Sequence, residues 1–230
     1  MNAIIIAAGI GSRLRPLTYT TPKPLINVLG KPMLERNIEY LIESNIKEIV
    51  IVVGYLKEKF EYLKEKYKEV ILIFNDKFYE YNNIYSFYLI REYLEDSYIL
   101  DGDIFITENI FNDSLKGSRY LAKKLKERNN EWQLIIQNNN IRKIEIGGNG
   151  NYIISGVSFF KKKDTEILKK LVEKYIKENK KEYFWDDIVR ENIKEFDIQI
   201  YPLNKNIIFE IDNLEELKLI DKSYKLYKGD

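Results

Sequence analysis

The amino-acid sequence predicts an α/β protein: a mixed, mostly parallel sheet flanked by helices, in a single domain. Short apolar runs alternate with helix-like stretches through the first half of the chain, and repeated units of this kind form parallel strands joined by right-handed crossovers. The 230 residues suffice for one such domain with a large core. No Pro/Ser-rich linker and no internal repeat divides the chain, so we expect residues 1–230 to fold as one unit.

The first half of the chain contains four predicted strands with helices between them. The strands are continuously apolar, which is typical of parallel strands that are covered on both faces. They are expected over residues 3–8, 48–54, 70–74 and 97–101. Helices are expected over 32–44, 56–67 and 83–94, the second because its apolar residues recur at three-to-four spacing.

The second half differs, because its strand-like segments follow one another closely. Segments 132–137, 142–146 and 152–160 are separated by short turns rich in Asn and Gly, which favours antiparallel or mixed pairing. We expect these strands to extend the sheet and to form one wall of a pocket. Helices near 164–178 and 185–194, short strands at 197–201 and 207–211, and a helix from near Asn213 complete the prediction.

The composition excludes several kinds of partner and chemistry. With 37 Lys and Arg against 36 Asp and Glu, no net field attracts nucleic acid or an anionic membrane. We find no apolar run of about 18 residues that could span a membrane, and the apolar start lacks the basic region of a signal peptide. Together with the absence of cysteine, this favours a cytoplasmic protein. With no histidine, a His base is excluded and any metal must be held by oxygen, which points to Mg²⁺.

The first predicted strand runs directly into a loop of small residues followed by cations. Its glycines let backbone N–H groups approach an anion closely, and Lys23 stands between two prolines that stiffen its backbone. A dinucleotide site would need a third glycine where this chain has Leu14, and no Gly-Lys-Ser/Thr of a P-loop follows. We interpret the loop as a cradle for a nucleoside triphosphate; the alternative is a tight turn with surface cations. The loop is Ala8-Gly9-Ile10-Gly11-Ser12-Arg13, and the cations are Arg13, Arg15 and Lys23.

Two pairs of carboxylates follow predicted strands. Asp101-Gly102-Asp103 ends the fourth strand, at the edge where α/β sheets place ligands. Glu210-Ile211-Asp212 has the alternating spacing that puts both carboxylates on one strand face. These groups can hold a hard cation against a triphosphate. The alternatives are a turn-forming aspartate at 101–103 and an Asp212 that caps the terminal helix.

Both tryptophans of the chain stand beside carboxylates, in Glu131-Trp132 and in the segment 182–187, Glu-Tyr-Phe-Trp-Asp-Asp. Indole faces with nearby carboxylates suit a quaternary ammonium, which donates no conventional hydrogen bond and is attracted by cation–π interactions. The alternative is that the tryptophans are ordinary core anchors, because large aromatic side chains are mostly buried.

The segments 7–18 (AAGIGSRLRPLT) and 21–25 (TPKPL) resemble the signature of the nucleotidyltransferases that make NDP-sugars and CDP-alcohols. Over nearly its whole length the chain is similar to the bacterial CTP:phosphocholine cytidylyltransferases of the LicC type, through segments 53–58, 74–77, 81–86, 155–159 and 185–186. The resemblance implies the Rossmann-like nucleotide-diphospho-sugar transferase fold. Residues 1–110 would form its nucleotide-binding half and residues 111–230 its acceptor-binding half.

The resemblance also implies roles for individual residues. Lys23, Arg13 and Asp103 would be catalytic, and Asp103 and Asp212 would ligate Mg²⁺. The nucleotide would be bound by Ala8, Gly9, Gly11, Ser12, Arg13, Lys23, Asn82, Asn83 and Ser86. The acceptor would be bound by Glu131, Trp132, Tyr183, Trp185 and Asp186. One departure is Phe184, where the resemblance leads us to expect a tyrosine; a shifted register would let Tyr183 supply that hydroxyl.

The activity expected from this resemblance is the synthesis of CDP-choline and pyrophosphate from CTP and phosphocholine. A phosphate monoester is already anionic at neutral pH, so the reaction needs no general base, in agreement with the missing histidine. The alternatives are a cytidylyltransferase for 2-aminoethylphosphonate or phosphoethanolamine, a sugar-1-phosphate nucleotidyltransferase, and a nucleotide sensor without catalysis. We expect small-molecule substrates, no nucleic-acid or membrane partner, and a monomer or homodimer.

Overall fold

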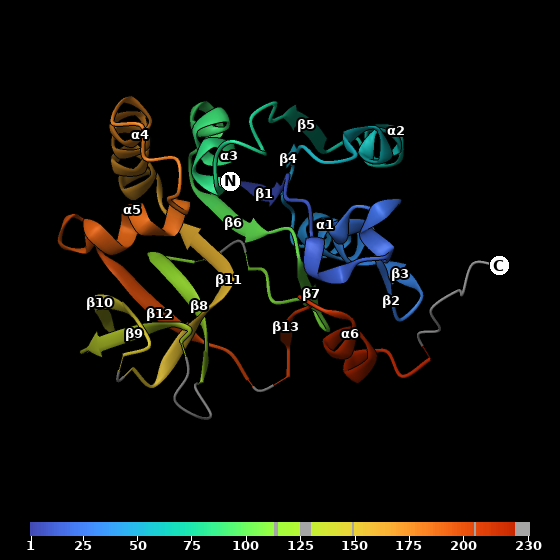
Figure 1. The fold of residues 1–230 in the computed structure, drawn as a ribbon. Coiled ribbons are helices and arrows are strands. Elements are labelled where there is room, and N and C mark those ends of the chain that lie inside the picture. The colour runs from blue at the N-terminus through green and yellow to red at the C-terminus, as the bar shows by residue number, and fades with distance from the viewer. Residues whose placement is uncertain (113–114, 125–129, 149, 205, 224–230) are drawn as a thin grey trace.

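The fold is taken from a computed structural model that describes residues 1–112, 115–124, 130–148, 150–204 and 206–223. Within these residues, one sheet of nine strands has the order β5-β4-β1-β6-β11-β8-β12-β10-β9 (Figure 1). The sheet runs without interruption through both halves of the chain. The prediction of an α/β fold with a mixed sheet flanked by helices is therefore confirmed.

The first half of the chain forms the parallel part of the sheet. Its strands are β1 (Asn2–Ala7), β4 (Ile49–Val53), β5 (Val70–Phe74) and β6 (Ser97–Asp101). Each coincides with a predicted strand to within a residue at either end. Strand β1 lies between β4 and β6 and is buried along its whole length, which explains its unbroken apolar sequence.

The second half pairs differently, so the description "mostly parallel" is correct only for the first half. Strand β11 (Tyr152–Phe160) pairs antiparallel with β6 and with β8 (Ser118–Lys124). Strands β9 (Trp132–Gln137) and β10 (Asn140–Ile146) form an antiparallel hairpin, and β12 (Ile198–Pro202) pairs parallel with β8. Strand β8 was missed, because its Arg and Lys residues interrupt the apolar pattern.

Two short strand pairings and the helices complete the described chain. Strand β7 (Ile104–Ile106) pairs with β13 (Ile208–Glu210), and β2 (Asn27–Val28) pairs with β3 (Lys31–Pro32). The helices are α1 (Met33–Glu43), α2 (Tyr62–Lys66), α3 (Asn83–Leu89), α4 (Lys162–Lys177), α5 (Trp185–Glu191) and α6 (Leu214–Ile220). None of the described helices is long and apolar enough to cross a membrane.

Two predicted helices are shorter than expected. The stretch 56–67 divides into a 3₁₀ turn, Lys57–Phe60, and the short helix α2. Leu56, just before the turn, has a left-handed conformation with φ 50°, so the helix does not begin there. The stretch 83–94 ends as an α-helix at Leu89 and continues as a 3₁₀ turn, Arg91–Tyr93. The apolar spacing that suggested longer helices still places Phe60 and Leu63 in the core.

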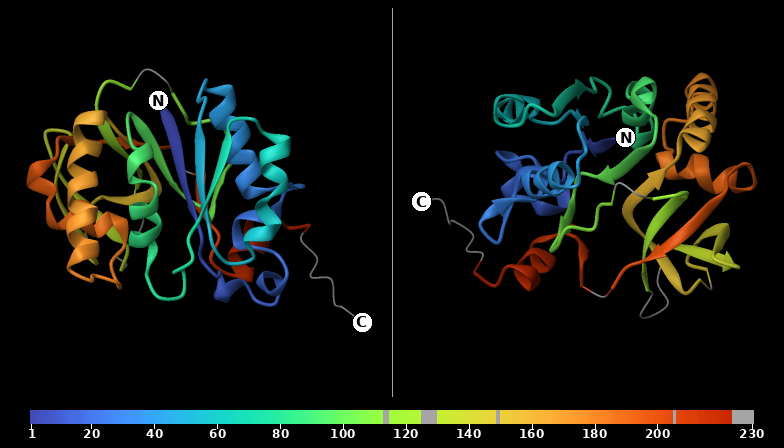
Figure 2. Two further views of the ribbon diagram at one scale, coloured as in Figure 1. Left: turned by 90° about the horizontal axis from the view of Figure 1, so that it is seen from above. Right: turned by 180° about the vertical axis from the view of Figure 1, so that it is seen from behind.

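The helices cover both faces of the sheet (Figures 1 and 2). On one face, Ile4 and Ile6 of β1 share a core with α3, α4 and α5. On the other face, Ala3 and Ile5 share a core with α1 and α2. A third, smaller core joins Leu14 of the loop after β1 to β7, to residue 211 and to α6. This last core holds β7 and the end of β13 close to the loop after β1.

Candidate active site

The loop after β1 is shaped by one glycine in the left-handed conformation. Gly11 has φ 65°, which is costly for residues with a Cβ. A Cβ at Gly11 would lie 2.8 Å from Cβ of Lys23 and 3.2 Å from Cγ2 of Thr18. By contrast, a Cβ at Gly9 would meet no heavy atom within 4 Å. Gly11 is thus required by the packing of the loop on Lys23, whereas Gly9 borders open space.

Two hydroxyls hold this loop in place. The Thr18 hydroxyl donates to the carbonyl oxygen of Gly11 at 2.9 Å, and the Tyr55 hydroxyl donates to the carbonyl oxygen of Thr18 at 2.8 Å. The backbone N–H of Tyr55 also donates to the carbonyl oxygen of Ala8 at 3.1 Å. Because Tyr55 follows β4, the end of this neighbouring strand fixes the loop. No pattern in the sequence marks Tyr55 or Thr18 as residues that hold this loop.

Lys23 is the centre of the site. Its ammonium Nζ lies 2.7 Å from Oδ2 of Asp103 and 2.7 Å from Oδ1 of Asp212. The residue is only 8% exposed. Burial by itself lowers the pKa of the ammonium, but the charges and hydrogen bonds of Asp103 and Asp212 outweigh it and raise the pKa above its usual value. Lys23 is therefore a cation throughout the neutral range.

Arg13 joins the same cluster from the loop. Its guanidinium nitrogen Nη2 lies 2.7 Å from Oδ2 of Asp212, and its side chain is 71% exposed. A cation that is paired on one side and free on the other can reach an anion arriving from solvent. The structure thus brings four predicted site residues together by ion pairs: Arg13, Lys23, Asp103 and Asp212.

A third carboxylate completes an acidic group. Oxygen atoms of Asp103, Glu210 and Asp212 all lie within 4.8 Å of one another. Strand β13 pairs antiparallel with β7, which puts Glu210 opposite Ile104 and next to Asp103. Partial desolvation and then the charges of Asp103 and Asp212 raise the pKa of the Glu210 carboxyl to about 7. Three carboxylate oxygens in such proximity are the donor set that a hard divalent cation prefers.

Asp212 does not cap the terminal helix. The N-cap of α6 is Asn213, whose side chain accepts from the backbone N–H groups of Glu215 and Glu216. The backbone N–H of Asp212 donates to Glu216 at 2.6 Å, so its carboxylate is left for Lys23 and Arg13. The capping alternative considered for Asp212 is thereby excluded.

The predicted residues at the start of α3 make contacts with other parts of the protein. The Asn83 side chain accepts from the backbone N–H of Trp185 at 2.8 Å. Asn82 caps α3 and donates to the carbonyl oxygen of Glu182. The buried Ser86 hydroxyl accepts from Asn75, which follows β5, at 2.9 Å. The Asn82 and Asn83 contacts tie α3 to the segment 182–185, and the Ser86 contact ties it to the residue after β5.

One aromatic pair lies at the surface of the second half. The rings of Trp132 and Phe184 meet edge to face with centroids 6.2 Å apart. The guanidinium of Arg190 lies 5.3 Å from the centroid of Trp132 and pairs with Asp187 at 2.7 Å. Trp132 is half-buried and Phe184 is exposed. Phe184 thus takes the place beside Trp132 where the resemblance suggested a tyrosine.

Two further predicted acceptor residues, Tyr183 and Glu131, have other contacts. The Tyr183 ring packs edge to face on Tyr175, and Lys180 lies over both rings. Glu131 is exposed just before β9, where its backbone carbonyl accepts from Gly147. Among the described residues, the Tyr183 ring contacts Tyr175 and not the Trp132–Phe184 pair. The Tyr183 hydroxyl therefore does not replace the tyrosine that we expected at position 184.

Trp185 lies inside the core rather than at the surface. It is 3% exposed and stacks on Phe87 with centroids 5.1 Å apart. It also stacks on Tyr120, at 6.5 Å, and meets Phe160 edge to face. Its role in the free protein is that of a core anchor, the alternative considered for both tryptophans. It sets the position of the next residue, Asp186.

Asp186 and Asp101 form a second acidic site. The Tyr120 hydroxyl donates to Oδ1 of Asp186 at 2.6 Å. Desolvation raises the pKa of the Asp186 carboxyl to about 7, against the lowering effect of Tyr120. Burial, and then the charges of Asp103 and Asp186, raise the pKa of Asp101 well above its usual value. Among the described residues, no Lys or Arg forms an ion pair with Asp101 or Asp186.

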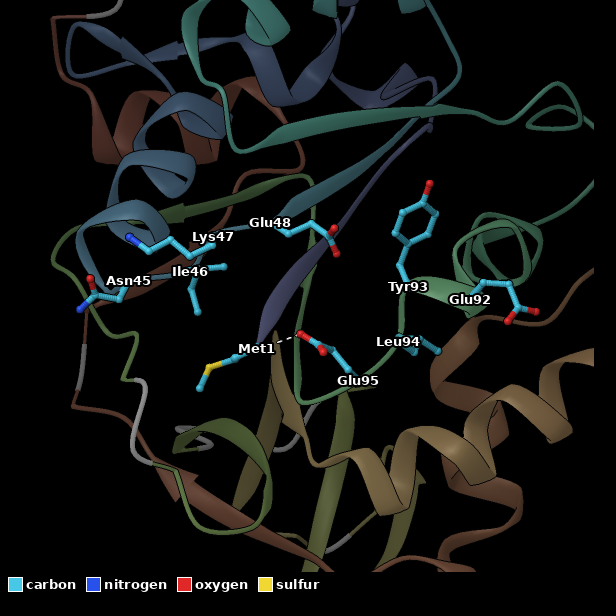
Figure 3. Close-up of a pocket in the computed structure, with 9 residues that line it drawn as sticks. All are labelled: Met1, Asn45, Ile46, Lys47, Glu48, Glu92, Tyr93, Leu94 and Glu95. Carbon is cyan, nitrogen blue, oxygen red and sulfur yellow. Dashed lines mark ion pairs between the residues drawn. The ribbon is translucent and has the colours of Figure 1, made fainter.

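A pocket of about 620 Å³ lies elsewhere, at the amino ends of the parallel strands (Figure 3). Its lining comes from the residues before β1, β4 and β6, including Met1, Glu48 and Glu95. The amino group of Met1 pairs with Glu95 at 2.7 Å. This is the edge of the sheet opposite to Lys23, and it takes no part in the site described above.

The fold, a glycine loop after the first strand and paired carboxylates at the strand ends define a nucleotidyl-transferring enzyme. The nucleotidyl transferase family matches residues 2–126, and the chain belongs to this family. Choline-phosphate cytidylyltransferase of Streptococcus pneumoniae is 41% identical over 98% of this chain and 99% of that protein. 2-Aminoethylphosphonate cytidylyltransferase of Lancefieldella rimae is 40% identical over 97% of this chain and 93% of that protein.

A solved structure agrees with both matches. The CTP:phosphocholine cytidylyltransferase LicC from Streptococcus pneumoniae has a TM-score of 0.93 at 41% identity, and the match covers 97% of this chain and 99% of that one. The resemblance on which the site was predicted is thereby confirmed, together with the nucleotide-diphospho-sugar transferase fold.

Proposed function

We propose that this protein transfers the cytidylyl group of CTP to phosphocholine, producing CDP-choline and pyrophosphate. The observation that carries the proposal is the position of Lys23. It is a buried cation at the carboxyl ends of the strands, held between Asp103 and Asp212 beside the Gly11 loop. A buried lysine surrounded by phosphate-binding features is suited to neutralise phosphate charge.

The reaction needs charge neutralisation and alignment more than it needs proton transfer. A phosphate oxygen of phosphocholine attacks the α-phosphorus of CTP, a new P–O bond forms, and the bond to the β-phosphate oxygen breaks. Pyrophosphate leaves with the electron pair. Lys23 and Arg13 stabilise the negative charge that spreads over the phosphates, and the loop N–H groups orient the chain of phosphates. The nucleophile is already ionised, so no side chain has to remove a proton.

A divalent cation fits the acidic group. Asp103, Glu210 and Asp212 would hold it with carboxylate oxygens, and we infer that Mg²⁺ is the cation used. When bound, it would neutralise part of the triphosphate charge. Lys23 and Arg13 pair with Asp103 and Asp212 in this structure, so a cation held by these carboxylates would leave Lys23 and Arg13 available to the phosphates.

The acceptor head group is inferred from charge. Asp101 and Asp186 are carboxylates without a cationic partner among the described residues, and the Trp132–Phe184 pair offers π faces nearby in sequence to Asp186. A quaternary ammonium can neutralise the carboxylates and also bind to the aromatic faces by cation–π attraction. The substrates are small molecules, and because CTP is a cytoplasmic nucleotide, the proposed place of action is the cytoplasm.

A second acceptor, 2-aminoethylphosphonate, is favoured by one observation. Trp185 lies in the core, so fewer aromatic rings are available to a head group than the sequence suggested. The carboxylates of Asp101 and Asp186 remain, and this balance suits a primary ammonium better than a quaternary one. A primary ammonium could donate hydrogen bonds to Asp101 and Asp186. The relative that is named for this acceptor is nearly as similar to this chain as the choline-phosphate enzyme.

The test is pyrophosphate release from a matrix of substrates. CTP, UTP, GTP and dTTP are each combined with phosphocholine, phosphoethanolamine, 2-aminoethylphosphonate and glucose-1-phosphate. We expect rapid release only with CTP, and fastest with phosphocholine. Rapid pyrophosphate release with glucose-1-phosphate, in the absence of any amino-alcohol phosphate or phosphonate, would contradict the proposal.

A further inference from the structure

Two neighbouring carboxylates at the start of α5 have different surroundings. Asp187 is fully employed by the fold: its Oδ2 accepts from the backbone N–H of Phe184 at 2.8 Å, and its Oδ1 pairs with Arg190 at 2.7 Å. Asp186 accepts a single hydrogen bond, from Tyr120 to Oδ1. Its second oxygen, Oδ2, receives none from the described residues. Asp186 is thus the carboxylate of the pair that remains available to a ligand.

Tyr120 is a rigid donor. It is fully buried on β8, with its ring stacked on Trp185 and held edge to face by Phe160 at 5.8 Å. A ring that is packed on both sides cannot swing its hydroxyl away without opening the core. The Tyr120 hydroxyl therefore fixes the direction in which the Asp186 carboxylate points.

We propose that Tyr120 is a positioning residue for the acceptor, because its hydroxyl holds the Asp186 carboxylate ready for the cationic head group. The inference rests on the proposed function, since it assumes a positively charged acceptor. Tyr120 itself touches no reacting atom; it acts only through Asp186. Nothing in the sequence pattern singled it out, because β8 was not predicted as a strand.

The charges that face Asp186 make this hydrogen bond decisive. Asp101 approaches it from β6 and Asp187 precedes Arg190 on its own helix, so like charge surrounds the carboxylate on two sides. Arg190 is held by Asp187 and by the Trp132 ring. Within the part of the chain that the structure describes, the Tyr120 bond is the contact that favours the ionised form of Asp186. Without it, a larger share of Asp186 is protonated at neutral pH and attracts a cation less strongly.

The experiment compares Tyr120→Phe with the wild type between pH 7 and pH 9, where the second ionisation of a phosphate monoester, near pH 6, is complete. At pH 7 we expect the KM for phosphocholine to rise about tenfold in Tyr120→Phe, since hydrogen bonds to charged groups are the strong ones. At pH 9 the increase should be smaller, because a larger share of Asp186 is then ionised and mainly the loss of its fixed orientation remains. The kcat and the KM for CTP stay unchanged.

The matched control is Tyr175→Phe. Tyr175 is also a buried tyrosine whose hydroxyl donates to a carboxylate of α5, Glu191, at 2.7 Å. This variant should leave the KM for phosphocholine unchanged at every pH. Thermal unfolding of both variants shows whether Tyr120→Phe is folded at the assay temperature.

A second variant keeps the test decisive if Tyr120→Phe is less stable. Asp186→Asn should raise the KM for phosphocholine at all pH values, and adding Tyr120→Phe to it should change the KM no further. An unchanged KM for phosphocholine at pH 7 in Tyr120→Phe, or an increase that adds to that of Asp186→Asn, would overturn the inference. Failure of the wild type to use any cationic acceptor would instead refute the proposed function, so the two failures are distinct.

Discussion

The Lys23 ammonium lies 2.7 Å from the Asp103 carboxylate, so the cation that we propose as catalytic is paired with a carboxylate that we propose as a metal ligand. The two residues are 80 positions apart in the sequence and meet because the loop after β1 and the end of β6 share one edge of the sheet. This pairing gives each residue a distinct and measurable role.

Replacing Lys23 should separate turnover from metal binding. We expect Lys23→Ala to lower kcat/KM about 10²- to 10³-fold, the usual loss when one stabilising donor is removed from a transition state. The variant should nevertheless bind Mn²⁺ at least as tightly as the wild type, because the carboxylates lose a competing cation. Calorimetric titration with Mn²⁺ measures the metal affinity. The control is Lys31→Ala, which removes a lysine that pairs with Glu39 at the surface. Weaker metal binding in Lys23→Ala would contradict the assigned role.

The two loop glycines should respond differently to alanine. Gly11→Ala places a Cβ in the left-handed region and against Lys23, and should cost about 1–2 kcal/mol of unfolding free energy from the backbone alone. Gly9→Ala meets no atom in the free protein, so its stability should not change, but its KM for CTP should rise. Chemical denaturation and initial rates measure the two effects. An unchanged KM for CTP in Gly9→Ala would argue against close approach of the nucleotide to this loop.

Metal affinity should depend on pH through Glu210. The pKa of its carboxyl is raised to about 7, so this ligand is protonated below that pH and ionised above it. We expect Mn²⁺ to bind more tightly as pH rises from 6 to 8. Glu210→Gln should bind Mn²⁺ more weakly and lose most of this pH dependence, whereas Asp197→Asn, at an exposed ion pair with Lys163, should behave as the wild type. A wild-type affinity that is flat over this range would exclude Glu210 as a ligand.

The Trp132 ring should affect only the acceptor. We expect Trp132→Ala to raise the KM for phosphocholine roughly 2- to 30-fold, in keeping with about 0.5–2 kcal/mol for a cation–π contact, and to leave the KM for CTP unchanged. Tyr201→Ala, at an exposed ring at the end of β12, is the control. Equal changes in both KM values would mean that Trp132 supports the fold rather than the head group.

The sequence predicted the parallel half of the sheet well, because buried parallel strands are apolar without interruption, as in β1 and β4. It missed β8, whose buried Tyr120, Leu121 and Ala122 stand between charged residues. The loop glycines and the Asp103 and Asp212 carboxylates carry local patterns, so they were found from the sequence.

Contacts between distant elements had no such pattern. Trp185 lies in the core because it packs on Phe87, Tyr120 and Phe160, which belong to three other elements. The isolation of Asp186 depends likewise on Asp187 being occupied by Arg190 and the Phe184 backbone. Only the folded arrangement shows which of two adjacent carboxylates is free.

The most direct test of the central proposal is an internal competition. Limiting CTP is incubated with equimolar phosphocholine and 2-aminoethylphosphonate, and the two cytidylyl products are quantified by mass spectrometry, which gives the ratio of the two kcat/KM values independently of enzyme concentration. The proposal predicts that CDP-choline is the dominant product. A mixture dominated by the cytidylyl ester of 2-aminoethylphosphonate would contradict it and would assign Asp101 and Asp186 to a primary ammonium.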